Sequence, residues 1–201
     1  MTPNMPQPPM WGLILSGGFS TRMKHDKALL NYHGTHQLGY CYELLSAQCE
    51  HVYVSCRADQ AQQYADFPQI HDQYAGIGPL SGILAAFDHQ PAVAWLVLAI
   101  DLPLVNPRTI DYLIRNRNPD KRATAFVNPE KGFPEPLCTI YEPTMQPILE
   151  NARKNQQYSI RKVLGNNDIH KIISEDHHLL NCNTPEEYQA IKHSEQRHLR
   201  R

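Results

Sequence analysis

Short apolar runs alternate along this chain with segments whose apolar residues recur at helical spacing. Runs bounded by turn-forming residues predict buried strands, and spacings of three and four residues predict helices. The expected strands cover residues 13–15, 51–55, 69–72, 92–100, 124–127, 136–141 and 170–173, with a short extended piece at 28–32. The expected helices cover residues 35–48, 58–64, 83–89, 106–115, 143–152 and 159–164, and a further helix begins within 183–187.

The most hydrophobic run, residues 92–100, is nearly unbroken and therefore predicts a central strand covered on both faces. Alternating strands and helices predict a mostly parallel, three-layer α/β domain. In such sheets, ligands bind beyond the carboxyl ends of the strands, where the strand order reverses. The 201 residues suit a single domain. We expect it at 11–192, between a flexible leader at 1–10 and a basic tail at 193–201.

Composition narrows the function classes. The formal net charge of −1 creates no basic field, so neither nucleic acid nor a membrane is an expected partner. The five cysteines form no C-x-x-C pair and read as reduced thiols of a cytosolic protein, and the eleven histidines have no metal-ligand spacing. The first nine residues lack the features of a signal peptide, and no apolar run approaches the roughly 18 residues of a membrane span. We therefore expect a soluble, cytoplasmic protein.

The loop after the first strand carries the strongest chemical signal. Ser16, Gly17 and Gly18 follow the strand directly, and Arg22 and Lys27 come shortly after. A strand end fixes the position, glycines let backbone N–H groups approach an anion, and two cations lie within reach, which suits a phosphate site. The spacing matches neither Walker A nor the dinucleotide fingerprint. The alternative is an ordinary strand-to-helix turn with solvated charges.

Asp101 is the second candidate, because it stands where the most buried strand ends. A carboxylate there is costly unless it is paired, hydrogen-bonded or bound to a cation. At the same sheet edge as the glycine loop, it would hold Mg²⁺ against nucleotide phosphates. The alternative is a helix N-cap or a turn aspartate.

Two further segments have weaker signals. Asp72 ends a short strand, and the adjacent residues 76–82, which contain three glycines, would let a base or ribose approach closely. A loop that merely needs unusual φ values explains these glycines equally well. Residues 181–184 read from chemistry alone as a capped helix start.

Five motifs together resemble one family. They are L-S-G-G-x-S-x-R-M-x-x-D-K at 15–27, G-P-L-S-G at 78–82, D-L-P at 101–103, E-P-L-C-x-x-Y at 135–141 and N-C-N-T-P-E-E at 181–187. In this order they are similar to the molybdenum cofactor guanylyltransferase (MobA-like) group of nucleotidyltransferases. The resemblance runs from Trp11 to Tyr188. The opening motif is typical of the broad class, and the last two point to the molybdopterin branch.

The resemblance implies a three-layer, Rossmann-like nucleotidyltransferase fold with a mostly parallel central sheet. It also implies transfer of GMP from GTP to molybdopterin with Mg²⁺ as cofactor and release of pyrophosphate. Transient contact with molybdenum cofactor insertion proteins or apo-enzymes fits such a role. The implied nucleotide-binding residues are Leu15, Ser16, Gly17, Gly18, Lys27, Ser55, Asp72 and Asp101. The implied catalytic residues are Arg22, Lys27 and Asp101, with Asp101 also the metal ligand, and Asn181 and Asn183 would face the pterin acceptor.

The chain departs from the family pattern at two positions. Lys24 stands where members usually have Gly, which strains the backbone if φ is positive there and otherwise adds a charge beside the triphosphate. Ser55 stands where members often have Asn, so its contact with the base is in question. Three alternatives stay open: a CTP-dependent cytidylyltransferase, a nucleotidyltransferase for another phosphorylated metabolite, and a nucleotide-binding module without catalysis.

Overall fold

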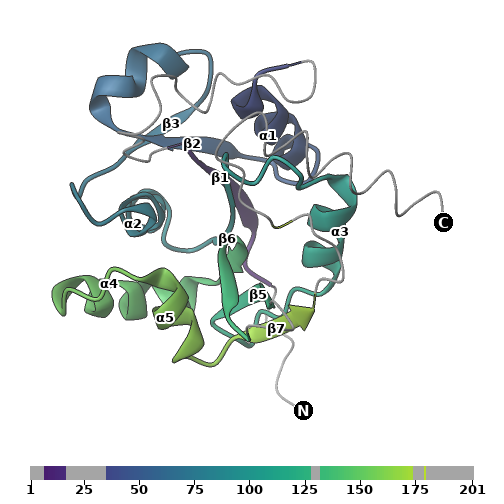
Figure 1. The fold of residues 1–201 in the computed structure, drawn as a ribbon, viewed down its shortest axis with the longest axis vertical. Helices are drawn as coiled ribbons and strands as arrows, with labels where there is room; N and C mark the ends of the chain where they lie inside the picture. Colours follow the sequence, from purple (N-terminus) through teal and green to yellow (C-terminus); the bar gives the residue numbers. More distant parts are fainter. Residues whose placement is uncertain (1–6, 17–34, 128–131, 174–178, 180–201) are drawn as a thin grey trace.

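A seven-stranded sheet forms the centre of the molecule, with helices on both of its faces (Figure 1). The computed structural model describes residues 7–16, 35–127, 132–173 and 179. The strands are β1 (Met10–Leu15), β2 (Val52–Cys56), β3 (Gln69–His71), β4 (Ala94–Ala99), β5 (Ala123–Val127), β6 (Pro134–Tyr141) and β7 (His170–Ile173). The α-helices are α1 (Gln37–Ser46), α2 (Pro79–His89), α3 (Pro107–Arg115), α4 (Gln146–Lys154) and α5 (Ile160–Gly165).

The strand order is β3-β2-β1-β4-β6-β5-β7. Strands β3, β2, β1 and β4 are parallel neighbours, and β5 and β7 are parallel as well. Only β6, among the described strands, runs antiparallel to its neighbours β4 and β5. The prediction of a mostly parallel α/β sheet is therefore confirmed. The chain runs outward from β1 to β3 and then returns to place β4 on the other side of β1, which puts the reversal of strand order between β1 and β4.

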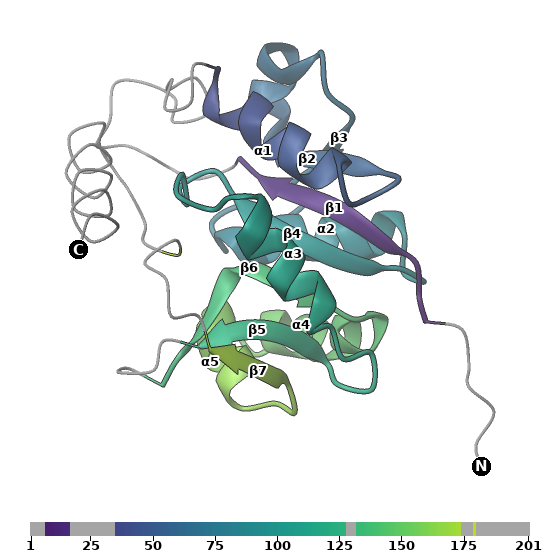
Figure 2. The same cartoon turned by 90° about the vertical axis from the view of Figure 1, so that its right-hand side faces the viewer.

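Burial of β4 explains its nearly continuous apolar sequence. All six of its residues are buried, and alternate side chains enter two different cores. Trp95 and Val97 pack in the core beneath α2, α4 and α5, whereas Leu96 and Leu98 pack in the core beneath α1 and α3. Figure 2 shows these two helix layers on opposite sides of the sheet.

Several helices begin or end differently from the prediction. Helix α2 begins at Pro79, four residues earlier than expected, because a proline at the first turn loses no helical hydrogen bond. Residues 143–145 form the 3₁₀ helix η3 rather than the first turn of α4, and residues 58–64 form the 3₁₀ helix η2. Asn106 caps α3 as expected, with its Oδ1 accepting from the backbone N–H groups of Arg108 and Thr109.

A buried ion pair joins three segments at the amino-terminal edge of the parallel strands. Glu142 follows β6 and is 1% exposed, and Arg117, which follows α3, is 10% exposed. The Arg117 guanidinium donates to both carboxylate oxygens of Glu142, at 2.7 and 2.9 Å, and to the carbonyl oxygen of Pro8 at 2.9 Å. The bidentate geometry suits Arg and satisfies a carboxylate that is almost entirely removed from water.

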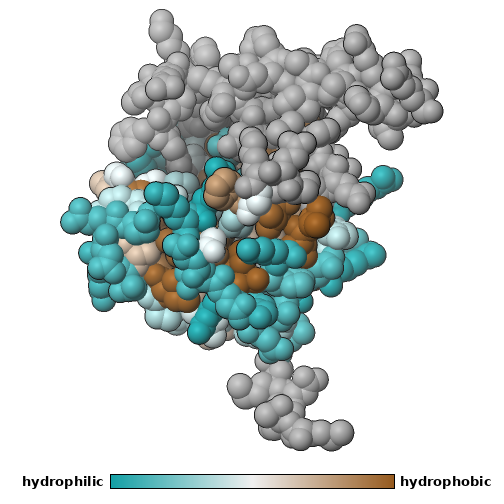
Figure 3. Space-filling model, turned by 60° about the horizontal axis from the view of Figure 1, so that its bottom comes forward, coloured by the Kyte–Doolittle hydropathy of each residue, from teal (hydrophilic) through white to brown (hydrophobic). Residues whose placement is uncertain are grey.

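The surface carries few large apolar side chains. Among the described residues, Tyr112, Phe133, Tyr158 and Ile173 are exposed. Figure 3 shows a face on which hydrophilic residues predominate around small apolar patches. In the part of the chain that the structure describes, no helix combines the length and the hydrophobicity that crossing a bilayer requires.

Replacing Arg117 by Ala should lower the free energy of unfolding by about 3–5 kcal/mol, because Glu142 would remain as an uncompensated buried charge. Urea denaturation followed by circular dichroism measures this change. Arg115→Ala is the matched control, since its pair with Asp111 lies on the surface and should contribute less than about 1 kcal/mol. Equal losses for the two variants would contradict a special role for the buried pair.

Candidate active site at the carboxyl edge of the sheet

Three of the predicted site residues meet where β1, β2 and β3 end. The strands are parallel and adjacent, with Leu15 in register with Ser55 and Ser55 in register with Ile70. Because parallel neighbours end at the same side of a sheet, Ser16, Ser55 and Asp72 lie at one edge. We refer to these three residues as the serine–aspartate cluster.

Hydrogen bonds connect the members of the serine–aspartate cluster. The Ser16 hydroxyl donates to the Ser55 carbonyl oxygen at 2.7 Å, and the Ser55 hydroxyl donates to Asp72 Oδ1 at 2.6 Å. The backbone N–H of Asp72 donates to the carbonyl oxygen of Cys56 at 2.9 Å. Both serines are buried, so their hydroxyl groups need these partners. The cluster thus holds the Asp72 carboxylate in a fixed orientation at the strand end.

Asp72 sits in an environment that disfavours its charge. Partial burial raises the pKa of the Asp72 carboxyl, and the hydrogen bond from Ser55, the charge of Arg57 and His71 oppose this rise. An additional hydrogen-bond donor would therefore stabilise the ionised form of this half-buried carboxylate.

Helix α2 packs directly against the serine–aspartate cluster through Gly82. A Cβ atom at this position would lie 2.1 Å from Ser55 Oγ and 2.8 Å from Leu15 Cδ2. Glycine is therefore required for close approach of the helix to β1 and β2. The preceding loop contains Gly76 at φ 76° and Gly78 at φ 62°, left-handed values that favour glycine. Gly76 and Gly78 thus have the unusual φ values that were one of the two explanations left open for this segment, and Gly82 serves packing.

Asp101 lies at the same edge, next to β1. The N–H of Ile100 donates to the carbonyl oxygen of Leu15 at 3.2 Å, which carries the parallel pairing of β1 and β4 to the residue before Asp101. Asp101 is half-buried in a turn. Ser16 and Asp101 therefore flank the point where the strand order reverses, which is where open α/β sheets bind ligands.

A second carboxylate, Glu135, lies near Asp101. In the antiparallel pairing of β4 with β6, Leu98 is in register with Cys138, so Glu135 at the start of β6 comes opposite the end of β4. Burial raises the pKa of Glu135, the backbone N–H of Leu137 and Arg161 lower it, and the charge of Asp101 raises it further. We call Asp101 and Glu135 the acidic pair. The sequence analysis included Glu135 in a motif but not among the site residues, since its position depends on the direction of β6.

Asp101 also affects a buried thiol, Cys41. Burial raises the pKa of Cys41 to about 12, and the charge of Asp101 adds to the rise. Cys41 is thus a protonated core residue, like the other buried thiols Cys49, Cys56 and Cys138. The reading of these four cysteines as free thiols is confirmed.

Six predicted site residues lie outside the described residues. They are Gly17, Gly18, Arg22, Lys27, Asn181 and Asn183, and Lys24 lies outside as well. Leu15, Ser16, Ser55, Asp72 and Asp101 are described, and the structure brings them to one edge of the sheet. In the described ranges, no group of three or more His, Cys, Asp and Glu side chains gathers as a metal cluster.

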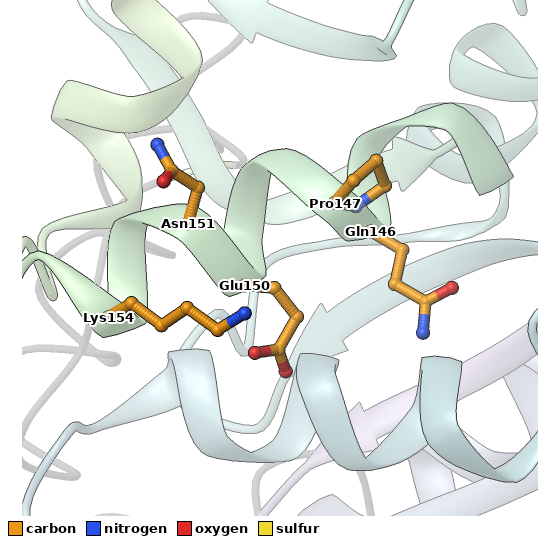
Figure 4. Close-up of a pocket in the computed structure, with 5 residues that line it drawn as sticks. All are labelled: Gln146, Pro147, Glu150, Asn151 and Lys154. Carbon is orange, nitrogen blue, oxygen red and sulfur yellow. The ribbon is translucent and has the colours of Figure 1, made fainter.

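A hollow of about 460 Å³ on α4 contains none of these residues. It is lined by Gln146, Pro147, Glu150, Asn151 and Lys154, all from one helix (Figure 4). A site formed by one helix surface lacks the convergence of several strand ends that marks the carboxyl edge. The carboxyl edge is therefore the stronger candidate for the active site, and this hollow is the weaker one.

Comparison with solved structures finds the same fold in a known protein. Molybdopterin-guanine dinucleotide biosynthesis protein A from Archaeoglobus fulgidus has a similar structure, with a TM-score of 0.76 at 23% identity over 94% of this chain and 100% of that one. This degree of likeness establishes the fold. It is the three-layer, Rossmann-like α/β arrangement, with the strand order reversing between β1 and β4.

The family follows from the sequence comparisons. A family model described as the MobA-like NTP transferase domain matches residues 12–172, and the chain belongs to this family of nucleotidyltransferases. A molybdenum cofactor guanylyltransferase from Pseudomonas putida is 32% identical over 90% of this chain and 97% of its own length. A molybdenum cofactor biosynthesis bifunctional protein from Synechocystis is 38% identical over 92% of this chain, which spans 54% of that longer protein. The resemblance stated from the motifs is confirmed.

Gly82→Ala should lower the free energy of unfolding by about 1–3 kcal/mol, because the added methyl group overlaps Ser55 Oγ. Urea denaturation measures the loss. Gly165→Ala is the control: nothing lies within 4 Å of its added Cβ, and helix propensity favours Ala. A Gly82 variant as stable as the Gly165 variant would show that α2 does not need this close contact.

Proposed function

We propose that this protein transfers GMP from GTP to molybdopterin, releases pyrophosphate and forms a guanine dinucleotide cofactor. The observation that carries the proposal is the convergence of the serine–aspartate cluster and Asp101 at the reversal of strand order. The guanylyltransferase names of relatives that match nearly end to end support the choice of nucleotide and acceptor.

Base recognition rests on Asp72 in this proposal. An ionised carboxylate only accepts hydrogen bonds, and the Watson–Crick edge of guanine presents two adjacent donors, N1–H and the N2 amino group. Ser55 occupies one lone pair of Oδ1 and fixes the carboxylate plane. The edge of cytosine presents only one donor, the N4 amino group, beside acceptors at N3 and O2 that a carboxylate repels. The chemistry of Asp72 therefore favours GTP over the CTP-dependent alternative.

Phosphate binding rests on the loop after Ser16. Backbone N–H groups at Gly17 and Gly18 would approach the triphosphate, and Arg22 and Lys27 would balance its charge. These assignments come from the motif. The described residue Ser16 supports them, since it begins the loop at the edge that also carries Asp101.

The acidic pair fits a magnesium ion in its donor chemistry. Mg²⁺ takes one or two carboxylates, and substrate phosphates and water complete its coordination, so a full protein cage is not needed. Asp101 would hold the ion, and Glu135 adds negative charge beside it. The bound ion would neutralise charge on the phosphates of the nucleotide.

The reaction itself is an in-line displacement. An oxygen of the acceptor's terminal phosphate forms a bond to the α-phosphorus of GTP, the bond from that phosphorus to the β-bridging oxygen breaks, and pyrophosphate leaves with the electron pair. The protein forms no covalent bond in this step. Its residues contribute by position and charge: Asp72 orients the base, and Lys27 and Arg22 stabilise charge on the transferring and leaving groups. Asn181 and Asn183 would orient the pterin acceptor.

A nucleotide screen with molybdopterin as acceptor tests the proposal. Pyrophosphate release is measured with GTP, CTP, ATP and ITP at equal concentrations. We expect GTP to be used roughly 5- to 150-fold better than CTP, since one unfavourable polar contact at the base is worth about 1–3 kcal/mol. Preference for CTP would establish a cytidylyltransferase, and GTP binding without pyrophosphate release would establish a module without catalysis.

Asp101→Asn should lower kcat by roughly 100-fold or more, the scale observed when one preorganised charge-stabilising group is removed from an active site. Steady-state pyrophosphate release measures kcat, and Mn²⁺ binding in the presence of GTP gives a second readout. Asp111→Asn, which alters an exposed acid of α3, is the control and should leave both unchanged. An Asp101 variant with wild-type turnover and metal binding would refute the metal assignment.

A further inference from the structure

A cation–π contact links α4 to the loop that follows Asp72. The guanidinium carbon of Arg153 lies 4.4 Å from the centre of the Tyr74 ring. Tyr74 comes two residues after Asp72, in the connection between β3 and α2. A contact at this distance is energetically useful because Arg offers a flat, weakly hydrated cation to the ring face.

Arg153 is held in place from its own helix. Its Nε and one terminal nitrogen donate to Glu150 Oε2, at 3.2 and 2.9 Å. Asp88 on α2 is close enough for its pKa to respond to both residues: burial and Glu150 raise it, and Arg153 lowers it. Figure 4 shows Glu150 and Lys154 projecting on one side of α4 and Asn151 on the other. The guanidinium thus lies between α4, α2 and the Tyr74 ring.

The Tyr74 loop depends on side-chain anchors for its position. The backbone N–H of Tyr74 donates to Ser81 Oγ at 3.0 Å, and the ring packs on the core beneath α2. Further along, Gly76 and Gly78 have nothing within 4 Å of an added Cβ, so they provide no packing restraint. Two side chains therefore hold the loop between Asp72 and the start of α2. Ile77 is buried in the core beneath α2, and Tyr74, the one nearer to Asp72, lies under the Arg153 guanidinium.

We propose that Arg153 is a positioning residue for base selection, which acts by clamping Tyr74 and so fixing the loop that begins at Asp72. The inference rests on the proposed role of Asp72 at the base. It extends the nucleotide site to α4, whose sequence carries no nucleotide-binding motif. In this proposal Arg153 does not touch the nucleotide. It restricts the position of the loop, and so of the Asp72 carboxylate that meets the edge of the base.

Four variants of the full-length chain test the clamp, with GTP and ITP binding followed by calorimetry. Arg153→Ala and Tyr74→Leu each remove one partner and should raise the Kd for GTP roughly 3- to 30-fold, the range that cation–π contacts span from exposed to desolvated sites. The double variant should bind GTP no more weakly than the weaker of the two single variants, because both substitutions remove the same interaction. Tyr74→Phe retains the ring face and should keep the affinity for GTP. ITP lacks the amino group of guanine, so the preference for GTP over ITP should shrink in the first two variants.

The control is Lys154→Ala, which removes the neighbouring exposed cation of α4 and should leave the Kd within about twofold. KM for GTP should rise in Arg153→Ala while kcat at saturating GTP stays within about twofold, a split that general loss of stability would not produce. If Arg153→Ala folds poorly, Arg153→Lys retains the positive charge near Asp88 and Glu150 and, without the planar group, should still weaken GTP binding.

Two results would overturn the inference in distinguishable ways. If the wild-type protein binds GTP and the Arg153 variants bind it with the same affinity and the same preference over ITP, the clamp alone is refuted. Wild-type protein that binds neither nucleotide would refute the proposed function, and the clamp with it.

Discussion

Burial of β4 on both faces is the constraint on which the rest of the structure depends. Its side chains alternate between two apolar cores, so no polar group can be placed along its length without a large desolvation cost. Chemistry is possible only where the strand ends, and Asp101 stands there. The same constraint requires covering helices on both faces of the sheet, which makes α1 and α3 one layer and α2, α4 and α5 the other.

The pairing of β1 with β4 then decides which polar groups meet. Since the two strands are parallel neighbours, Ser16 and Asp101 lie side by side although they are far apart in the sequence. The opposite edge carries the buried pair of Arg117 and Glu142, which joins the start of β1 to the ends of α3 and β6. The fold thus separates a buried, bidentate ion pair at one edge from the carboxylates Asp72, Asp101 and Glu135 at the other.

Local pattern was enough to predict most elements and to place Ser16, Ser55, Asp72 and Asp101 at one edge of the sheet. Strong apolar runs define strands such as β4, and Asn106 defines the start of α3, because both signals lie within a few residues. The direction of β6 was not predictable, since antiparallel pairing with β4 is a tertiary choice that leaves no mark on a short apolar run. For the same reason Glu135 was missed as a neighbour of Asp101. The contact of Arg153 with Tyr74 depends on how α4 packs beside α2, which residue spacing does not reveal.

The electrostatics of the carboxyl edge argue for a positively charged complement. Burial raises the pKa values of Asp72 and Glu135, so this edge already resists negative charge before any substrate arrives. A nucleoside triphosphate and a phosphorylated acceptor would add several negative charges in the same place. Such a site binds phosphates only if cations accompany them, and here the order of the chain matters. Arg22 and Lys27 follow β1 in the sequence, so in the proposed site they would supply positive charge at the strand end where the carboxylates gather, and a divalent cation on Asp101 would supply the remainder.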